Sequence, residues 1–215
     1  MSLYEEFLSH NGRLIHKWKH YFPAYERHFA PWQNKTVTFL EIGAGAGGSL
    51  QMWKRFFGPH ATIIGVDNRV ECKAYEEDQI HVRLGFQQDP KFLQSLIDEF
   101  GIMDVILDDG SHMMTDIKAS FEFLYPKMPK NGVYAVEDLH TAYWPRNQGG
   151  LGRPGTFIEI AKSLIDDMHA EYTSGEREVS EFTKNTIGIS FYDSLVFLER
   201  GNLTRKFAPK IGGSA

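Results

Sequence analysis

The chain has 215 residues, of which 42% are hydrophobic and 24% charged, and this composition is typical of a globular protein of one domain. Its 23 basic and 28 acidic side chains give a net charge of -5, which argues against a surface built for nucleic acid or for an anionic membrane. No apolar run approaches the roughly 20 residues of a membrane span, and the N-terminus is polar. The single cysteine, Cys72, excludes a disulfide within the chain. We therefore expect a cytoplasmic protein without nucleic-acid or membrane partners.

In chain order, short β-rich runs alternate with helical patterns. Two short helices are predicted first, at residues 3–8 and 14–21. Strands are then predicted at residues 36–42, 61–67, 80–84, 103–108 and 132–137, followed by a closing hairpin at 186–191 and 194–199. Apolar residues with a helical period predict amphipathic helices at residues 50–57, 92–100, 117–124 and 157–168.

Near-continuous apolar strands that alternate with helices are typical of a parallel sheet covered on both faces. We therefore predict an α/β fold, a Rossmann-like, doubly wound sheet of seven mostly parallel strands with an antiparallel last strand. We expect one domain over residues 1–215, with an N-terminal helical cap at 1–30 and the Rossmann-like core at 36–200. Ligands bind such sheets at the carboxyl ends of the strands, near the first strand.

A glycine-rich loop follows the first predicted strand, where residues 41–49 have the sequence EIGAGAGGS. Gly43, Gly45 and Gly48 have the G-x-G-x-x-G spacing of a dinucleotide-binding loop, in which glycines let the backbone turn sharply and approach a ligand closely. We predict that these glycines and Ser49 contact a nucleoside cofactor. The alternative is that the glycines make only a tight turn.

Side chains around this loop favour S-adenosylmethionine as the cofactor. Glu41, inside the strand end, suits the positively charged amino group of a methionine moiety better than it suits a pyrophosphate. Asp67 ends the second strand, where it can accept hydrogen bonds from both ribose hydroxyls of S-adenosylmethionine or of a nicotinamide dinucleotide. Gln87 and Asp89 follow the third strand and can bond to adenine, although Asp89 precedes Pro90 and can instead cap the next helix.

The strongest chemical signal is a set of acids at the ends of two strands. The fourth strand ends in DDGSH and the fifth in EDLH. Because these strands are predicted neighbours about 4.8 Å apart, their acids repel one another unless a divalent cation lies between them. We predict that Asp109, Glu137 and Asp138 bind Mg²⁺, with Mn²⁺ or Ca²⁺ as alternatives, and that Asp108 lies on the cofactor side. The alternative is that these acids cap loops or face solvent.

Two histidines and two aromatic residues lie next to these acids. His112 is the predicted general base, because a neutral imidazole can take a proton from a substrate hydroxyl whose pKa a metal held by Asp109 would lower. Asp109 and His112 are thus the predicted catalytic residues, and His140 is the alternative base. Together with His140, Tyr143 and Trp144 are predicted to contact the acceptor as an aromatic wall, although they can equally pack within the loop.

The strings LEIGAGAGGSLQMW, DVILDDGSH and VYAVEDLHTAYWP resemble the metal-dependent O-methyltransferases that act on the sugars of macrolide and polyketide antibiotics, and cephalosporin hydroxylase-type proteins look similar. The resemblance covers residues 36–145 and, more loosely, 17–30. It implies that the second acid of DDGSH and the ED pair bind Mg²⁺ and that the histidine is the base, which are Asp109, Glu137, Asp138 and His112. Phe86 departs from the family, which often has an acid there.

The sequence therefore predicts an S-adenosylmethionine-dependent O-methyltransferase that methylates a hydroxyl of a small molecule, either a sugar or a polyketide-type natural product. An NAD(P)-dependent oxidoreductase would explain the glycines and Asp67 but not the acids. A non-catalytic S-adenosylmethionine-binding protein is the third reading. The sequence leaves open which hydroxylated acceptor is used and whether the chain forms a homo-oligomer.

Overall fold

Seven strands form one sheet, in the order β3-β2-β1-β4-β5-β7-β6, in the computed structural model, which describes residues 2–203 and 206–213. They are β1 (Val37–Ile42), β2 (Ala61–Asp67), β3 (Ile80–Leu84), β4 (Val105–Asp108), β5 (Val133–Val136), β6 (Thr186–Tyr192) and β7 (Leu195–Arg200). The first five strands pair in parallel, while β7 runs antiparallel to both β5 and β6. This confirms the predicted doubly wound sheet and its antiparallel last strand, and it places β1 beside the switch point.

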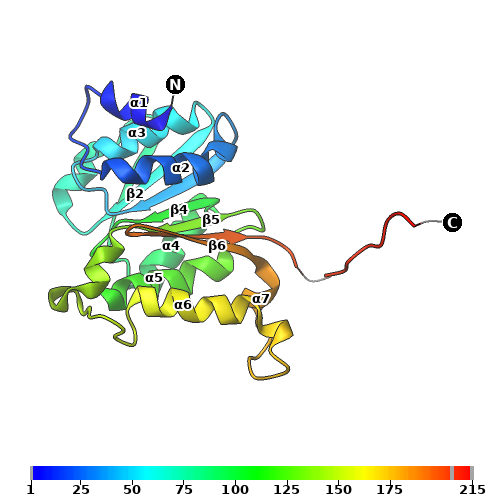
Figure 1. Cartoon of the computed structure of the whole chain (residues 1–215). Coiled ribbons are helices and arrows are strands. Elements are labelled where there is room, and N and C mark those ends of the chain that lie inside the picture. The colour runs from blue at the N-terminus through cyan, green and yellow to red at the C-terminus, as the bar shows by residue number, and fades with distance from the viewer. Residues whose placement is uncertain (1, 204–205, 214–215) are drawn as a thin grey trace.

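Helices cover both faces of the sheet (Figure 1). On one face lie α1 (Leu3–Leu8), α2 (Phe22–Phe29) and α3 (Gly48–Phe57); on the other lie α4 (Pro90–Phe100), α5 (Met114–Leu124) and α6 (Phe157–Met168). Because side chains alternate along a strand, each strand contributes to two cores. Phe39 of β1 packs in the core beneath α2 and α3, and its neighbour Leu40 packs in the core beneath α4 and α5.

Shorter helical segments complete the chain. They are η1 (Lys19–Tyr21), η2 (Ala30–Trp32), η3 (Val70–Tyr75), η4 (Tyr125–Lys127), η5 (Leu139–Tyr143), η6 (Pro145–Asn147), η7 (Ala170–Tyr172) and α7 (Glu181–Asn185). None of the helices in the described residues combines the length and the apolarity that a membrane span requires.

The N-terminal segment departs from the predicted helix at residues 14–21. The first helix forms as predicted, but residues 11–18, the N-terminal linker, contain no helix and pass the start of α3. Gly48 permits this passage, because a Cβ at Gly48 would lie 2.2 Å from the carbonyl oxygen of Arg13. Pro23 in the first turn then favours the later start of α2. Tertiary contacts of the linker therefore override the helical pattern.

Candidate active site

A cavity of about 570 Å³ opens at the carboxyl ends of the parallel strands. Its walls come from the N-terminal linker, the glycine-rich loop and the segments that follow β2, β3, β4 and β5. The predicted residues that line it are Gly43, Gly45, Ser49, Asp67, Gln87, Asp109, His112, Glu137 and Asp138. The predicted residues outside its wall are Glu41, Gly48, Asp89, Asp108, His140, Tyr143 and Trp144.

The glycine-rich loop follows β1, and its backbone packs against the residue that follows β4. Gly43 has φ +97°, and a Cβ there would lie 1.9 Å from the carbonyl oxygen of Asp109. Only glycine fits this position, because the conformation and the space both exclude a side chain. Gly45 has φ +57° and nothing within 4 Å of the position of a Cβ. The loop therefore leaves open space beside Gly45, where a ligand can approach the backbone.

Asp67, the last residue of β2, lines the cavity beside the glycine-rich loop. Its Oδ2 accepts a hydrogen bond from the backbone N–H of Gly45 at 3.1 Å, and Arg69 donates to both of its oxygens. Partial burial would raise the pKa of Asp67, but the hydrogen bonds from Arg69 outweigh it and hold the pKa below its ordinary value. The carboxylate therefore stays ionised and able to accept hydroxyl hydrogen bonds. The sequence reasoning missed Arg69, which lies two residues after the acid.

Glu41 is fully buried behind the cavity wall. Its carboxylate accepts hydrogen bonds from Ser49 Oγ at 2.6 Å and from Trp53 Nε1 at 3.3 Å, and it pairs with Lys17 Nζ at 3.2 Å. Burial raises the pKa of Glu41, and the charge of Lys17 opposes that rise. The cation beside Glu41 is thus a lysine of the chain itself, and the contact of Glu41 with the amino group of a methionine moiety stays a prediction.

Asp108 is also buried, on the other face of the sheet. Ser120 Oγ donates to its carboxylate at 2.5 Å, Gln87 Nε2 at 3.0 Å and Tyr134 OH at 3.2 Å. Gln87 also accepts from the backbone N–H of Ser111 through Oε1 at 2.7 Å, so these bonds fix the loop that follows β4.

Asp89 caps the N-terminus of α4, where its side chain accepts from the backbone N–H of Lys91 at 2.9 Å. It lies outside the cavity wall, so the geometry matches the helix-capping alternative rather than a contact to adenine.

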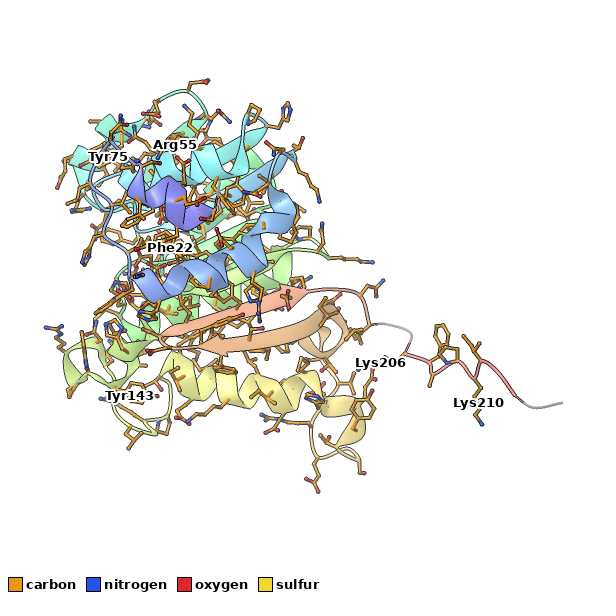
Figure 2. All side chains as sticks on the ribbon, turned by 45° about the horizontal axis from the view of Figure 1, so that its top comes forward. Phe22, Arg55, Tyr75, Tyr143, Lys206 and Lys210 are labelled. Atoms are coloured by element: carbon orange, nitrogen blue, oxygen red, sulfur yellow. The ribbon has the colours of Figure 1, made fainter. Side chains whose placement is uncertain are left out.

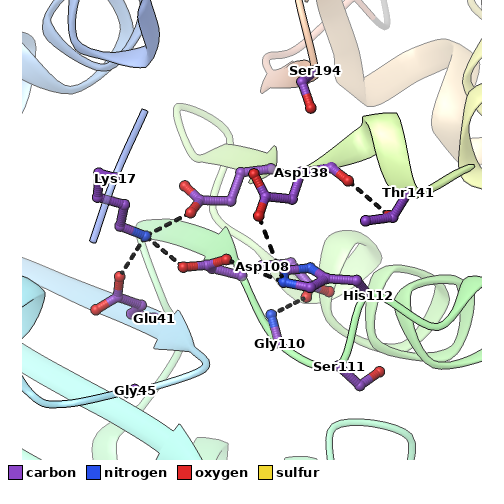
Figure 3. A network of polar contacts seen from close by, with 12 residues as sticks. Lys17, Glu41, Gly45, Asp108, Gly110, Ser111, His112, Asp138, Thr141 and Ser194 are labelled. Atoms are coloured by element: carbon purple, nitrogen blue, oxygen red, sulfur yellow. Dashed lines mark hydrogen bonds and ion pairs between the residues drawn. The ribbon is translucent and has the colours of Figure 1, made fainter. Parts of the chain in front are cut away.

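Asp109, Asp138 and His112 meet at the other end of the cavity, and Figure 3 shows His112 beside Asp138. His112 Nε2 lies 3.7 Å from Asp109 Oδ1 and 3.7 Å from Asp138 Oδ2. Within the described part of the chain, one ligand atom from each of these three side chains lies within 4.8 Å of the other two. Carboxylate oxygens are ligands that Mg²⁺ and Mn²⁺ prefer, so Asp109 and Asp138 fit the predicted ion, and His112 Nε2 lies beside them.

The backbone at this end is held in an uncommon conformation. His112 has φ 55° and Asp138 has φ 57°, both in the left-handed region. Asp and His tolerate this region better than most residues, and such conformations cluster at functional sites. The two strand-end loops thus aim their side chains inward at a small cost in backbone energy.

Lys17 joins these acids to Glu41, and the sequence reasoning missed it. The lysine comes from the N-terminal linker and its side chain is 3% exposed. Its Nζ lies 2.6 Å from Asp109 Oδ2 and 2.6 Å from Glu137 Oε1. Burial alone would lower the pKa of Lys17, but attraction to the acids outweighs it and raises the pKa well above its usual value. The ammonium therefore remains charged among the acids (Figure 3).

Glu137 lies deeper than the other two predicted ligands. Lys17 and Tyr25 both donate to its carboxylate, which is almost fully buried. Burial raises the pKa of Glu137 well above its ordinary value, and the charge of Asp109 adds to the rise. Glu137 lines the cavity but is not in the compact group formed with His112.

A second cavity, of about 510 Å³, lies beside η5. The predicted acceptor residues His140 and Tyr143 line it together with apolar residues of α6 and with the β6–β7 turn. Figure 2 shows Tyr143 at the surface beside α6. His140 Nδ1 lies 2.7 Å from Ser194 Oγ and 4.0 Å from Asp138 Oδ1, so it stands between the two cavities. Trp144 lies outside both walls, with the guanidinium of Arg146 4.5 Å above its ring.

Comparisons with known proteins relate the chain to several named O-methyltransferases. No family model matches it. It is 38% identical over 190 residues to the 8-demethyl-8-alpha-L-rhamnosyl tetracenomycin-C 2'-O-methyltransferase of Streptomyces olivaceus, covering 84% of this chain and 50% of that protein. It is 38% identical over 205 residues to the demethylmacrocin O-methyltransferase of Streptomyces fradiae, covering 87% and 51% respectively. The chain thus spans about half the length of these curated relatives.

A solved structure resembles the whole described fold. MycE, a methyltransferase from the mycinamycin biosynthetic pathway in complex with Mg, SAH and mycinamycin VI, superimposes with a TM-score of 0.86 at 32% identity. The match covers 97% of this chain and 56% of that one.

Proposed function

The chain is a homologue of these macrolide and tetracenomycin sugar O-methyltransferases, and we propose that it transfers a methyl group from S-adenosylmethionine to a sugar hydroxyl of a glycosylated small molecule. One observation carries this proposal: a single cavity is lined by both the glycine-rich loop with Asp67 and the group of Asp109, His112 and Asp138. A nucleoside cofactor bound at the first set of residues would present its methyl group toward the second.

The reaction needs an oxygen nucleophile that is aligned with the sulfonium methyl group and deprotonated. The hydroxyl oxygen forms a bond to the methyl carbon as the carbon–sulfur bond breaks, which leaves a thioether and a methyl ether. His112 Nε2 takes the hydroxyl proton in this proposal, because it lies beside both acids and lines the cavity. Asp109 and Asp138, with Glu137 behind them, would hold a divalent cation, and that cation would lower the pKa of the hydroxyl.

The second cavity is the proposed site of the acceptor's apolar part. Leu139, Ile158, Ile165 and Phe191 give it an apolar wall. His140 connects it to Asp138, so a sugar attached to an apolar aglycone could reach the acids while the aglycone stays outside. The names of the relatives describe glycosylated macrolides and tetracenomycins, which have this two-part chemistry.

The two alternative functions account for fewer of the residues at this site. A nicotinamide-dependent oxidoreductase would use the glycine-rich loop and Asp67 but would give the acids of β4 and β5 no role. A non-catalytic S-adenosylmethionine-binding protein would not need His112 beside two acids in the same cavity.

The test is a methyl-transfer assay with S-adenosylmethionine, Mg²⁺ and a panel of glycosylated acceptors that includes mycinamicin VI and demethylmacrocin. Mass spectrometry should show one added methyl group, and EDTA should abolish the product. Equal product in EDTA would contradict the metal's role. Calorimetric binding of NAD without binding of S-adenosylmethionine would overturn the cofactor. Binding of S-adenosylmethionine without transfer to any acceptor would favour the non-catalytic reading.

A further inference from the structure

Three N-terminal side chains donate hydrogen bonds to the acids at the strand ends. Lys17 Nζ lies 2.6 Å from Asp109 Oδ2, and Tyr21 OH lies 2.7 Å from Asp138 Oδ1. Tyr25 OH donates to Glu137 Oε2. The donors are four residues apart along the N-terminal linker, η1 and α2, so they reach the acids one after another.

In Asp109 and Asp138 these hydrogen bonds use only one oxygen of the carboxylate, whereas both oxygens of Glu137 accept, one from Lys17 and one from Tyr25. In Asp109, Oδ2 is held by Lys17 and Oδ1 faces His112 Nε2 at 3.7 Å. In Asp138, Oδ1 is held by Tyr21 and Oδ2 faces the same nitrogen at 3.7 Å. The donors therefore decide which oxygen of Asp109 and which oxygen of Asp138 points at His112.

We propose that Lys17, Tyr21 and Tyr25 are positioning residues of the metal site, which fix the orientation of Asp109, Asp138 and Glu137 for a divalent cation. The proposal rests on the function proposed above. Ligand carboxylates that are not held by a second group rotate, and losing such a group weakens metal binding by about 10- to 100-fold. The N-terminal segment is thus part of the metal site, although none of its side chains is a ligand in this proposal.

A rival reading is that the Lys17 ammonium takes the place of a metal ion. Its three carboxylate contacts, at 2.6, 2.6 and 3.2 Å, are consistent with that role as well. The two readings predict opposite effects of removing the ammonium. If Lys17 positions the acids, its removal weakens metal binding; if it replaces the ion, its removal strengthens metal binding.

The experiment measures Mn²⁺ and Mg²⁺ dissociation constants by calorimetry, and the Mn²⁺ electron paramagnetic resonance spectrum, for the full chain without acceptor. Tyr21→Phe removes one hydroxyl and keeps the ring. We expect the Mn²⁺ dissociation constant to rise about 10-fold or more, with a changed spectrum. Tyr25→Phe and Lys17→Gln should act in the same direction.

Tyr125→Phe is the matched control. Tyr125 is also buried, and its hydroxyl bonds to Thr186 Oγ1 at 2.8 Å in the core on the other face of the sheet. The control should bind Mn²⁺ as the wild-type protein does. Thermal denaturation of each variant separates a loss of folding from a loss of orientation.

Two outcomes would overturn the proposal. The first is that folded Tyr21→Phe and Lys17→Gln proteins bind Mn²⁺ with wild-type affinity and spectrum, or bind it more tightly. In that case the methyltransferase proposal still stands if the wild-type chain transfers methyl groups. The second is that the wild-type chain binds neither ion, which would remove the metal from both proposals.

Discussion

The two ends of the main cavity are built in different ways. The cofactor end consists of the glycine-rich loop and Asp67, which are close in sequence: the bond from Gly45 to Asp67 spans 22 residues. The acid end is assembled from distant segments, and the bonds from Lys17 to Asp109 and to Glu137 span 92 and 120 residues. Backbone conformation shapes the first end, whereas buried charge and its compensation shape the second.

Because of this difference, the two ends should respond differently to substitutions. A glycine loop depends on φ angles and on space for the backbone, which are local properties. A cluster of buried acids is stable only while a counter-charge and hydrogen bonds are supplied by other parts of the fold. Substitutions at the acid end should therefore have the larger effects and should depend on pH, and the following predictions test that contrast.

The largest effect is expected for His112→Ala. Loss of a general base should lower the turnover number by about 10²- to 10⁴-fold, while the affinity for S-adenosylmethionine measured by calorimetry stays close to that of the wild type. His140→Ala is the comparison, since His140 is the alternative base. An unchanged rate for His112→Ala, together with a large loss for His140→Ala, would move the role to His140.

Lys17→Met should lower the free energy of unfolding by about 3–5 kcal/mol near pH 8, because it leaves buried acids without their counter-charge. The folded-state pKa of Glu137 is raised, chiefly by burial, so the folded protein binds this proton more tightly than the unfolded chain does. Stability tied to this group therefore increases as the pH falls through the raised value, and the deficit of the variant should shrink as the pH is lowered. Urea denaturation at a series of pH values measures this deficit.

The control for this substitution is Lys118→Met on α5. Lys118 is 49% exposed and pairs with Glu122 at 3.7 Å, so its loss should change stability by no more than about 0.5 kcal/mol. Equal losses for the two lysines would show that the buried acids do not need the ammonium of Lys17.

Gly43→Ala tests the cofactor end, with an expected loss of about 1–3 kcal/mol from backbone strain. The added Cβ would also lie against the carbonyl oxygen of Asp109, so the end of β4 must shift. Gly45→Ala is the matched variant: its φ is positive too, but nothing lies within 4 Å of its Cβ. Gly45→Ala should lower the free energy of unfolding by less than Gly43→Ala does, and neither decrease should vary with pH. Identical stability of the two variants would argue against the contact between the loop and β4.

The smallest effect is expected for Arg69→Ala. Exposed ion pairs contribute about 0–1 kcal/mol, and the side chain of Arg69 is 49% exposed. Arg69 holds the folded-state pKa of Asp67 below its ordinary value. The pair therefore contributes to stability above the ordinary pKa of an aspartate, about 3.9. This contribution is lost as the pH falls through the lowered folded-state pKa of Asp67. A double-mutant cycle with Asp67→Asn isolates the pair, and a coupling that persists at low pH would contradict this assignment.

Much of the fold could be predicted because its signals are local. The strand pattern, the glycine spacing and the position of DDGSH and EDLH after two strands were sufficient to predict the sheet and to bring the acids together, since parallel strands share one carboxyl edge. The helix predicted at residues 14–21 was wrong because the linker is held by contacts to residues far away in the sequence. The local sequence around Asp89 was not sufficient to assign its role, because it fits both a helix cap and a contact to a ligand.

The sequence by itself determined the alternation of strands and helices from β1 to α6, the glycine loop and which acids follow β4 and β5, because each of these follows from spacing along the chain. Only the tertiary structure decided that Lys17 pairs with Glu41, Asp109 and Glu137, and that Tyr21 and Tyr25 donate to Asp138 and Glu137. The donors are four residues apart in the sequence, but this spacing does not identify their partners. A buried charge is stabilised by whatever lies next to it in space, and neighbours in space are set by the packing of the whole chain.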